Sequence, residues 1–194
     1  AIDVAFALAR NSGLGPSFST SSTLIAVAMG MLSQSSPAAR WQPRSRHSVG
    51  SNRDMTTCVA FREQLRSMVA PLPSFNDFVI KAAAQALRQY PNVNAAYKDG
   101  HFEQYGDVNV GFAVPAGDLL AMPVLMNADQ KGLAQIARES RELAGAVRAR
   151  TVQPAQLSGG TFSISNLGMY GVARFTAILN PPQAAILAVG AIKR

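Results

Sequence analysis

The hydrophobic pattern of this chain alternates between helical and strand-like periods, and that alternation most constrains the fold. From Asp54 onward, apolar residues recur at helical spacing over residues 55–69, 75–90 and 131–149. Between and after these segments, β-rich runs predict strands over residues 108–114, 119–126, 161–165 and 184–189. No internal repeat is present. The pattern excludes an all-helical or all-strand domain and permits a layered α/β fold.

Local signals sharpen the second and third helices. Ser74 is a good N-cap, Asp77 lies in the first turn where the helix dipole favours an acid, and Pro91 ends the helix. Its apolar face is predicted to comprise Phe75, Phe78, Val79, Ala82, Ala86 and Leu87. The buried face of the third helix is predicted to comprise Leu133, Ile136, Ser140, Leu143 and Val147. Its charged residues would face solvent.

Two strand signals carry turn or edge residues. Lys98, Asp99 and Gly100 predict a turn between two strand-like pieces. Pro123 interrupts "LLAMPVLM", residues 119–126, so this buried strand is expected at a sheet edge or at a bulge.

Composition favours a single globular domain. The chain has 194 residues, 48% of them hydrophobic, and no apolar run approaches the ~18 residues that cross a bilayer. We therefore expect no membrane partner. Cys58 is the single cysteine, so no internal disulfide and no cysteine-rich metal site form, which suits a reducing compartment. Cys58 itself is predicted to be a small, half-buried apolar residue.

The net charge of +7 is concentrated at the front of the chain. Residues 1–53 hold five arginines and one acidic residue and are rich in serine, a composition shared by organellar targeting segments and unfolded basic arms. Residues 23–32, "TLIAVAMGML", could instead form a short buried helix that begins the fold. "RWQPRSRH" reads as a solvated linker, and we predict no nucleic-acid partner. We place a boundary after residue 53, with the core domain over residues 54–194.

The run "TFSIS" places hydroxyls at every second position. Period two puts Thr161, Ser163 and Ser165 on one strand face and Phe162 and Ile164 on the other, which is core. The hydroxyl face is either an ordinary solvent-exposed edge or, because Ser165 ends the strand beside glycines, part of a ligand site. A serine nucleophile would need a base, but both histidines, His47 and His101, read as surface residues. Common hydrolase, zinc and nucleotide motifs are absent from the sequence.

Three long segments carry a resemblance to a known family. They are "SFNDFVIKAAAQALRQYPNVNAAY", "NADQKGLAQIARESRELAGAVRARTVQPAQLSGGTFSISN" and "GGTFSISNLGMYGVARFTAILNPPQAAILAVGAI". Together they resemble the catalytic core of 2-oxo acid dehydrogenase dihydrolipoamide acyltransferases over residues 54–194. The "NPP" turn and the "SNLGMYG" loop are most similar to the pyruvate-specific branch, so the resemblance favours acetyl transfer.

The resemblance implies a fold, a reaction and a site. The fold would be a two-layer α/β sandwich of the chloramphenicol-acetyltransferase-like type, with a mixed sheet and helices on one face. The family moves an acyl group between a dihydrolipoyl thiol and coenzyme A; both are substrates, and no tightly bound cofactor or metal is implied. By motif, Ser165 would stabilise the oxyanion. The substrate channel would be shaped by Asn166, Leu167, Gly168 and Met169.

The resemblance also implies partners and a compartment. Family members build homotrimers with channels between subunits, assemble these into larger cores and bind the other subunits of the complex. We expect the mitochondrial matrix or the bacterial cytoplasm.

Departures from the family pattern leave the activity open. The family's base lies in a histidine-x-x-x-aspartate-glycine motif after the strand resembled by "PPQAAILAVGAI", and neither His47 nor His101 falls in such a motif. Residues 23–32 lack the arginines of the comparable family helix, and Leu119 and Met122 replace a glycine and a threonine. We expect a C-terminally incomplete core that is inactive alone. The alternatives are a noncatalytic core or anchoring subunit and, less well matched, a stand-alone antibiotic acetyltransferase.

Overall fold

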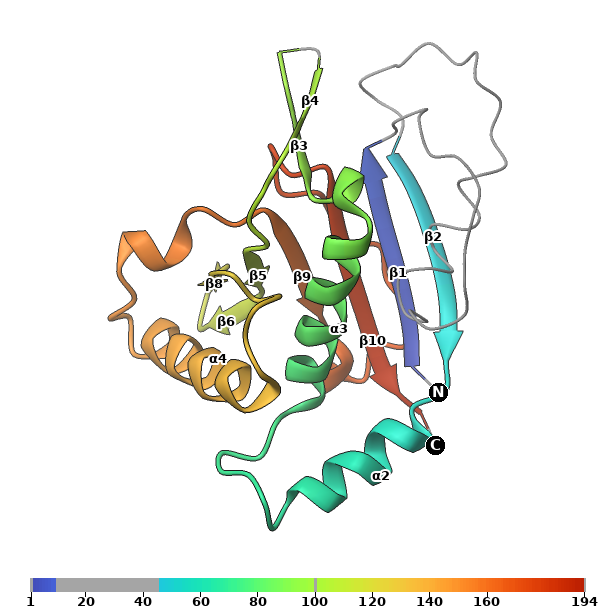
Figure 1. Ribbon diagram of the computed structural model, residues 1–194, viewed down its shortest axis with the longest axis vertical. Coiled ribbons are helices and arrows are strands. Elements are labelled where there is room, and N and C mark those ends of the chain that lie inside the picture. Colours follow the sequence, from blue (N-terminus) through green and yellow to red (C-terminus); the bar gives the residue numbers. More distant parts are fainter. Residues whose placement is uncertain (1, 10–45, 100, 194) are drawn as a thin grey trace.

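A computed structural model describes residues 2–9, 46–99 and 101–193, whose centre is a mixed six-stranded sheet (Figure 1). The strand order is β2-β1-β10-β9-β5-β8. These strands are β1 (Ile2–Ala9), β2 (Arg46–Arg53), β5 (Val110–Phe112), β8 (Val124–Leu125), β9 (Phe162–Asn166) and β10 (Ala185–Ile192). The three strands β10, β9 and β5 run parallel, and the outer pairings are antiparallel. The mixed sheet agrees with the expectation.

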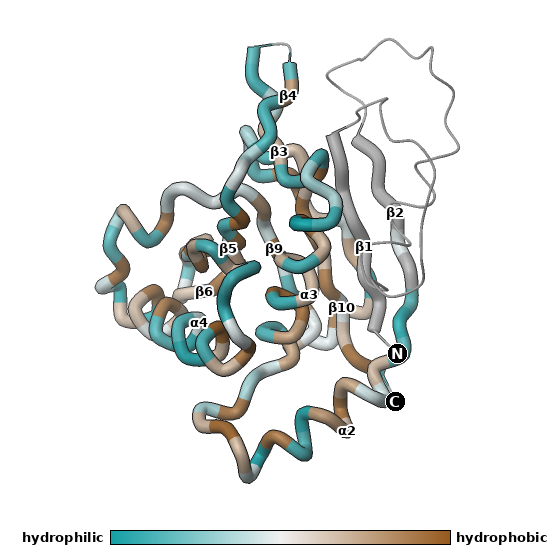
Figure 2. Tube along the Cα trace, in the orientation of Figure 1, coloured by the Kyte–Doolittle hydropathy of each residue, from teal (hydrophilic) through white to brown (hydrophobic). Residues whose placement is uncertain are grey.

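Two helices, α3 (Phe75–Gln89) and α4 (Leu133–Arg148), pack on one face of this sheet (Figure 1). Apolar residues of both helices form one core cluster with Val110, Phe162 and Leu187 of the sheet. Figure 2 shows apolar stretches along β5 and β10, whereas the turns of α3 nearest the viewer are hydrophilic. The architecture is therefore a two-layer α/β sandwich, as expected.

The predicted helices at residues 75–90 and 131–149 are confirmed within one or two residues at each end. Ser74 caps α3 through a reciprocal capping box with Asp77, which also lies in the first turn as predicted. Of the six residues predicted for its apolar face, Val79, Ala86 and Leu87 are buried, and Phe75, Phe78 and Ala82 are half-buried. Ile80, Ala83 and Ala84 are buried as well, so the buried face is shifted from the predicted one. In α4, Ile136, Ser140, Leu143 and Val147 are buried as expected, and Leu133 is half-buried.

The first predicted helix is shorter than expected. Instead of residues 55–69, α2 covers Thr56–Leu65, and a turn follows in which the Met68 amide donates to Leu65 O. None of its residues is buried, so little packing energy extends the helix beyond its local propensity. Cys58, however, is half-buried against the core as predicted, and burial raises the pKa of its thiol.

The predicted strand over residues 119–126 is divided by Pro123. Its first part, β7 (Leu119–Ala121), pairs with β6 (Val114–Ala116) in a separate two-stranded sheet, and Leu119 and Leu120 are 62% and 68% exposed. Only β8 is buried and joins the main sheet, at its edge. The prediction of one buried strand was wrong because proline cannot donate to a ladder, whereas its placement at an edge is confirmed.

Strand β9 lies inside the sheet between β5 and β10, so the solvent-exposed-edge interpretation of its hydroxyl face was wrong. Thr161, just before the strand, and Ser163 are buried. The Thr161 hydroxyl bonds the backbone of Asn109, and the Ser163 hydroxyl donates to Gln183 Oε1 at 2.6 Å. Polar side chains occupy this buried face because each has a partner there.

The predicted turn at residues 98–100 joins β3 (Ala95–Lys98) to β4 (His101–Gln104), a hairpin that projects from the body in Figure 1. Asp99 has φ +48°, and Gly100 lies outside the described residues. Lys98 pairs with Glu103 at 3.0 Å, and this hydrogen bond lowers the pKa of Glu103. The short helix η2 (Pro91–Val93) connects α3 to the hairpin.

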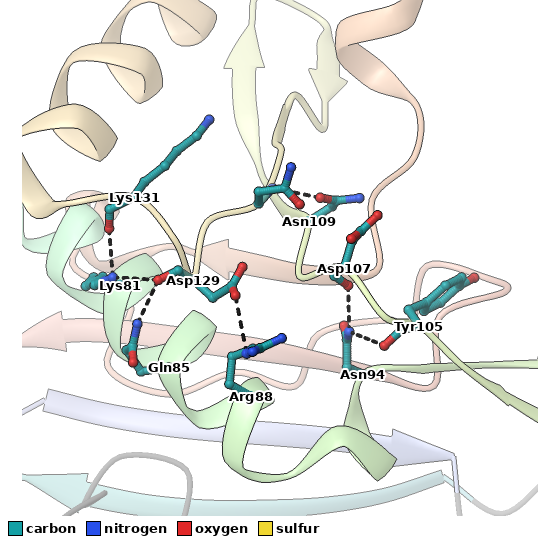
Figure 3. Close-up of polar contacts among 10 residues, drawn as sticks. Lys81, Gln85, Arg88, Asn94, Tyr105, Asp107, Asn109, Asp129 and Lys131 are labelled. Carbon is teal, nitrogen blue, oxygen red and sulfur yellow. Dashed lines mark hydrogen bonds and ion pairs between the residues drawn. The ribbon is translucent and has the colours of Figure 1, made fainter.

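Polar contacts tie α3 to the segment before α4 (Figure 3). The Lys81 ammonium donates to the carbonyl oxygens of Asp129 and Lys131 at 2.9 and 2.7 Å, and Gln85 donates to the same Asp129 carbonyl. Arg88 lies 3.4 Å from the Asp129 carboxylate. These contacts fix the spacing between the helices that form one layer.

Residues 2–9 and 46–53 form β1 and β2, and β1 pairs with β10. The division at residue 53 stays a prediction, and the predicted helix at residues 23–32 lies outside the described residues. Within the described part of the chain, no helix is both long and apolar enough to cross a bilayer.

Candidate functional site

The segment after β9 folds into a tight loop held by its own polar groups. The Gly168 amide donates to Asn166 Oδ1 at 2.9 Å, and the Leu167 amide donates to Val189 O at 3.0 Å. The helical turn η4 (Gly168–Tyr170) follows and ends at Gly171, whose φ is +73°. A Cβ on Gly168 would lie 2.6 Å from Gly190 O, so only glycine fits there without a backbone shift.

Asn166 connects this loop to the helical layer. Its Nδ2 donates to Oδ1 of Asn76, in the first turn of α3, at 3.1 Å. Asn166 therefore uses both ends of its amide, one within the loop and one across to α3.

A cavity of about 570 Å³ lies between this loop, the start of α3 and one side of α4. Its lining includes residues at or beyond the carboxyl ends of β5, β9 and β10, the edge where open α/β sheets commonly bind ligands. Its apolar walls include Phe75, Phe112 and Val189, and its polar lining includes Asn76, Asn166, Arg141 and Arg148.

The charges of the cavity differ in their availability. Asp77 is buried, and its carboxylate accepts hydrogen bonds from the Ser74 amide and hydroxyl and, at 2.6 Å, from the Ser140 hydroxyl. Arg141 and Arg148 lie two turns apart on α4, and both are exposed. The cavity thus offers guanidinium donors at its wall, while its carboxylate is occupied internally.

Three of the four predicted substrate-contacting residues, Asn166, Gly168 and Met169, line this cavity. Among the described residues, its lining includes neither Leu167 nor Ser165. Whether any of the four contacts substrate stays a prediction.

Ser165 lies on the other face of β9. Its side chain alternates with those of Ile164 and Asn166, so it shares the face of Ser163, away from α3 and α4. Ala188 is its partner in β10. Ser165 is half-buried, and the described residues provide no hydrogen bond to its hydroxyl. The structure therefore separates Ser165 from the cavity, and its predicted catalytic role stays a prediction.

Sequence reasoning missed Asn76, Arg141 and Arg148. Asn76 directly precedes Asp77 in a first turn whose Ser74 cap was evident, but its partner is 90 residues away and gives no local signal. The arginines followed the helical period and were interpreted as solvating charges.

His101, the histidine whose side chain the structure describes, does not line this cavity. His101 is exposed on the hairpin, 3.5 Å from Glu103, and His47 lies in β2, where its side chain is not described. Within the described residues, no group of three or more histidine, cysteine and acidic side chains is arranged to hold a metal ion.

Comparison with known proteins places the chain in a family. Residues 39–194 match the family described as 2-oxoacid dehydrogenases acyltransferase (catalytic domain). The Arabidopsis thaliana acetyltransferase component 3 of the mitochondrial pyruvate dehydrogenase complex is 43% identical over 147 residues, covering 71% of this chain and 27% of that protein. The corresponding Schizosaccharomyces pombe component is 48% identical over 117 residues, covering 60% of this chain and 24% of that protein. The chain thus spans about a quarter of the length of these relatives.

Solved structures agree in fold. A probable dihydrolipoamide acetyltransferase from Listeria monocytogenes superposes with a TM-score of 0.69 at 37% identity, covering 73% of this chain and 62% of that one. The Azotobacter vinelandii dihydrolipoamide acetyltransferase, in which the catalytic roles of a serine, a histidine and an asparagine were investigated, gives 0.69 at 34% identity, covering 71% and 59%.

The two-layer α/β core and its similarity to these acetyltransferase structures define a domain of the chloramphenicol-acetyltransferase-like fold, as expected. The chain belongs to the 2-oxoacid dehydrogenase acyltransferase family, in its catalytic domain.

Proposed function

We propose that this chain is part of an acyltransferase core that transfers an acetyl group between dihydrolipoamide and coenzyme A within a pyruvate dehydrogenase type complex. The observation that carries the proposal is the family match over residues 39–194, which includes the whole Ser165–Met169 segment. The similar proteins named above are acetyltransferase components of that complex, which favours acetyl over other acyl groups.

The proposed chemistry is attack of one thiol on the thioester of the other. The dihydrolipoyl sulfur forms a bond to the acetyl carbon of acetyl-coenzyme A, the thioester oxygen becomes an oxyanion, and loss of the coenzyme A thiolate completes the transfer. The Ser165 hydroxyl, which has no partner among the described residues, would donate a hydrogen bond to that oxyanion. The reverse reaction uses the same steps.

The attacking thiol must lose its proton, and the chain lacks a matched base. Neither His47 nor His101 lies in the family's histidine motif, so we propose that these 194 residues alone do not catalyse transfer. Coenzyme A and the dihydrolipoyl group act as substrates, and no metal or tightly bound cofactor takes part.

The proposed assembly is a homotrimer or a larger core. One similar structure is the cubic core of a pyruvate dehydrogenase multienzyme complex, at 34% identity and a TM-score of 0.69. Because Ser165 lies on the sheet face opposite α3 and α4, a neighbouring copy on that face would enclose its hydroxyl. Other subunits of the complex would be partners, in the mitochondrial matrix or the bacterial cytoplasm.

Two assays test the proposal. Calorimetric titration should show that the chain binds coenzyme A. Transfer from acetyl-coenzyme A to dihydrolipoamide should be absent for the chain alone and should appear when imidazole is added as an external base. Ser165→Ala should lower this rescued rate by about 10²- to 10³-fold, whereas Ser158→Ala, an exposed serine, should leave it unchanged.

Other outcomes redirect the assignment. Transfer without imidazole would overturn the inactivity of the isolated chain, and a rescued rate unaffected by Ser165→Ala would overturn the role of that hydroxyl. The alternative assignment is a noncatalytic core or anchoring subunit. That alternative predicts co-assembly with an active acyltransferase core but neither coenzyme A binding nor imidazole-dependent transfer.

A further inference from the structure

Two consecutive residues in the first turn of α3 make contacts in different directions. Asn76 accepts a hydrogen bond from Asn166 at the end of β9, and Asp77 accepts one from Ser140 in the middle of α4. All four residues line the cavity. The start of α3 therefore joins the two walls between which the cavity opens.

The Asn76 contact fits an orientation of the Asn166 amide that the loop itself fixes. The Gly168 N–H can only donate, so the Asn166 carbonyl oxygen must point toward the loop and its NH₂ group toward Asn76 Oδ1 in α3. The Asn166 carbonyl oxygen accepts a hydrogen bond from the Gly168 amide at 2.9 Å. If the Asn166 amide turned over, two donors would meet at Gly168 and that hydrogen bond would be lost.

The loop has little other freedom to adjust. Gly168 lies so close to Gly190 O that a Cβ would be 2.6 Å from it, and the Leu167 amide is held by Val189 O. A change in the orientation of the Asn166 amide would therefore shift the positions of Gly168 and Met169, which line the cavity.

We propose that Asn76 is a positioning residue for the substrate loop at residues 166–169. It acts through Asn166 and contacts no reacting atom, and it holds the loop at the separation from α3 and α4 that a bound substrate requires. The choice of coenzyme A as the substrate rests on the proposed function, whereas the hydrogen bond between Asn76 and Asn166 does not.

Two substitutions of similar size separate positioning from folding. Asn76→Asp keeps an acceptor oxygen and places an acid in the first turn, where the helix dipole favours it. Asn76→Leu removes the acceptor and keeps the same branching and the same number of side-chain heavy atoms. Urea unfolding midpoints identify any variant that loses stability globally.

The first readout is hydrogen exchange at the Gly168 amide, measured by NMR. We expect Asn76→Leu to accelerate this exchange by about 3- to 10-fold, the range for loss of one hydrogen bond, and Asn76→Asp to leave it within about 2-fold of wild type. Exchange of the Leu167 amide, which donates to Val189 O, is the internal control. Adding Asn166→Ala to Asn76→Leu should cause no further acceleration.

The second readout is the dissociation constant for coenzyme A. Asn76→Leu should weaken binding by about 3- to 10-fold. The positioning role is overturned if hydrogen exchange at Gly168 is unchanged in Asn76→Leu, or if both variants accelerate it equally. It is also overturned if Asn76→Leu leaves the dissociation constant for coenzyme A unchanged. If the wild-type chain does not bind coenzyme A, the proposed function is overturned, and so is the assignment of coenzyme A as the ligand of this loop. The hydrogen-exchange data would still show whether the Asn76–Asn166 hydrogen bond positions the loop.

Discussion

The Asp77 carboxylate lies 2.6 Å from the Ser140 hydroxyl, and this contact joins the first turn of α3 to the middle of α4. Both residues are buried, and Asp77 also accepts two hydrogen bonds from Ser74. The Asp77 side chain therefore caps its own helix and also binds the neighbouring helix, which helps to fix the distance between α3 and α4.

Asp77→Ala should lower the free energy of unfolding by about 2–4 kcal/mol, because it removes a helix-terminal acceptor and leaves the buried Ser140 hydroxyl without its carboxylate. Urea denaturation followed by circular dichroism measures the change. Ser74→Ala, which removes only one side of the capping box, should cost about 1 kcal/mol. Equal losses in the two variants would contradict the bridging role of Asp77.

Gly168→Ala should destabilise the loop after β9, since the added Cβ would lie 2.6 Å from the backbone oxygen of Gly190. We expect a loss of about 1–3 kcal/mol, the cost of overpacking at a rigid site. Gly106→Ala is the matched control, because a Cβ there meets nothing within 4 Å. If thermal unfolding shows the same midpoint for both variants, the close approach of Gly168 to β10 is wrong.

Ser163→Ala should destabilise the fold by about 1–3 kcal/mol by leaving the buried Gln183 Oε1 without its donor. Gln183 also donates to Gly160 O at 2.8 Å, so it connects the segment before β10 to the start of β9. In a double-mutant cycle measured by urea unfolding, Ser163→Ala and Gln183→Ala should be strongly non-additive. Additive losses would show that the two side chains do not interact.

Glu139 should contribute stability that depends on pH. Burial alone would raise the pKa of this carboxyl, but hydrogen bonds from Lys131 and Gln135 outweigh it and lower the pKa. A carboxyl with a lowered folded-state pKa stabilises the fold above its unfolded pKa, and this contribution disappears as the pH falls through the folded pKa. Glu139→Gln should cost about 0.5–1 kcal/mol at pH 7 and nothing in strong acid. A pH-independent difference in unfolding free energy would contradict this account.

Elements with strong local signals were predictable from the sequence. The Ser74 cap and the helical periods identified α3 and α4, and the alternation in "TFSIS" identified β9, because these signals lie within a few residues. Residues 55–69 appeared equally helical, yet α2 ends at Leu65, because no tertiary packing was available to continue it. Sequence periodicity does not report whether a face has something to pack against.

Some of the residues that line the cavity were singled out from the sequence, and their role in binding substrate stays a prediction. The loop at residues 166–169 was predicted from its glycines and from a family resemblance, and three of its residues line the cavity. Asn76, Arg141 and Arg148 come from helices far away in the chain, and only the folded structure brings them together. Ser165 and Asn166 are neighbours in sequence but lie on different sides of the sheet, which alternation implied and the single-channel interpretation did not consider.

Strand β9 pairs with a parallel strand on each side, and these two pairings fix its register. A register shift of one residue would move Phe162 and Ile164 to the face where Thr161 and Ser163 have their hydrogen-bond partners. It would also place the hydroxyls in the apolar core beneath α3. The hydroxyl at position 165 therefore projects from a strand that is hydrogen-bonded along both of its edges.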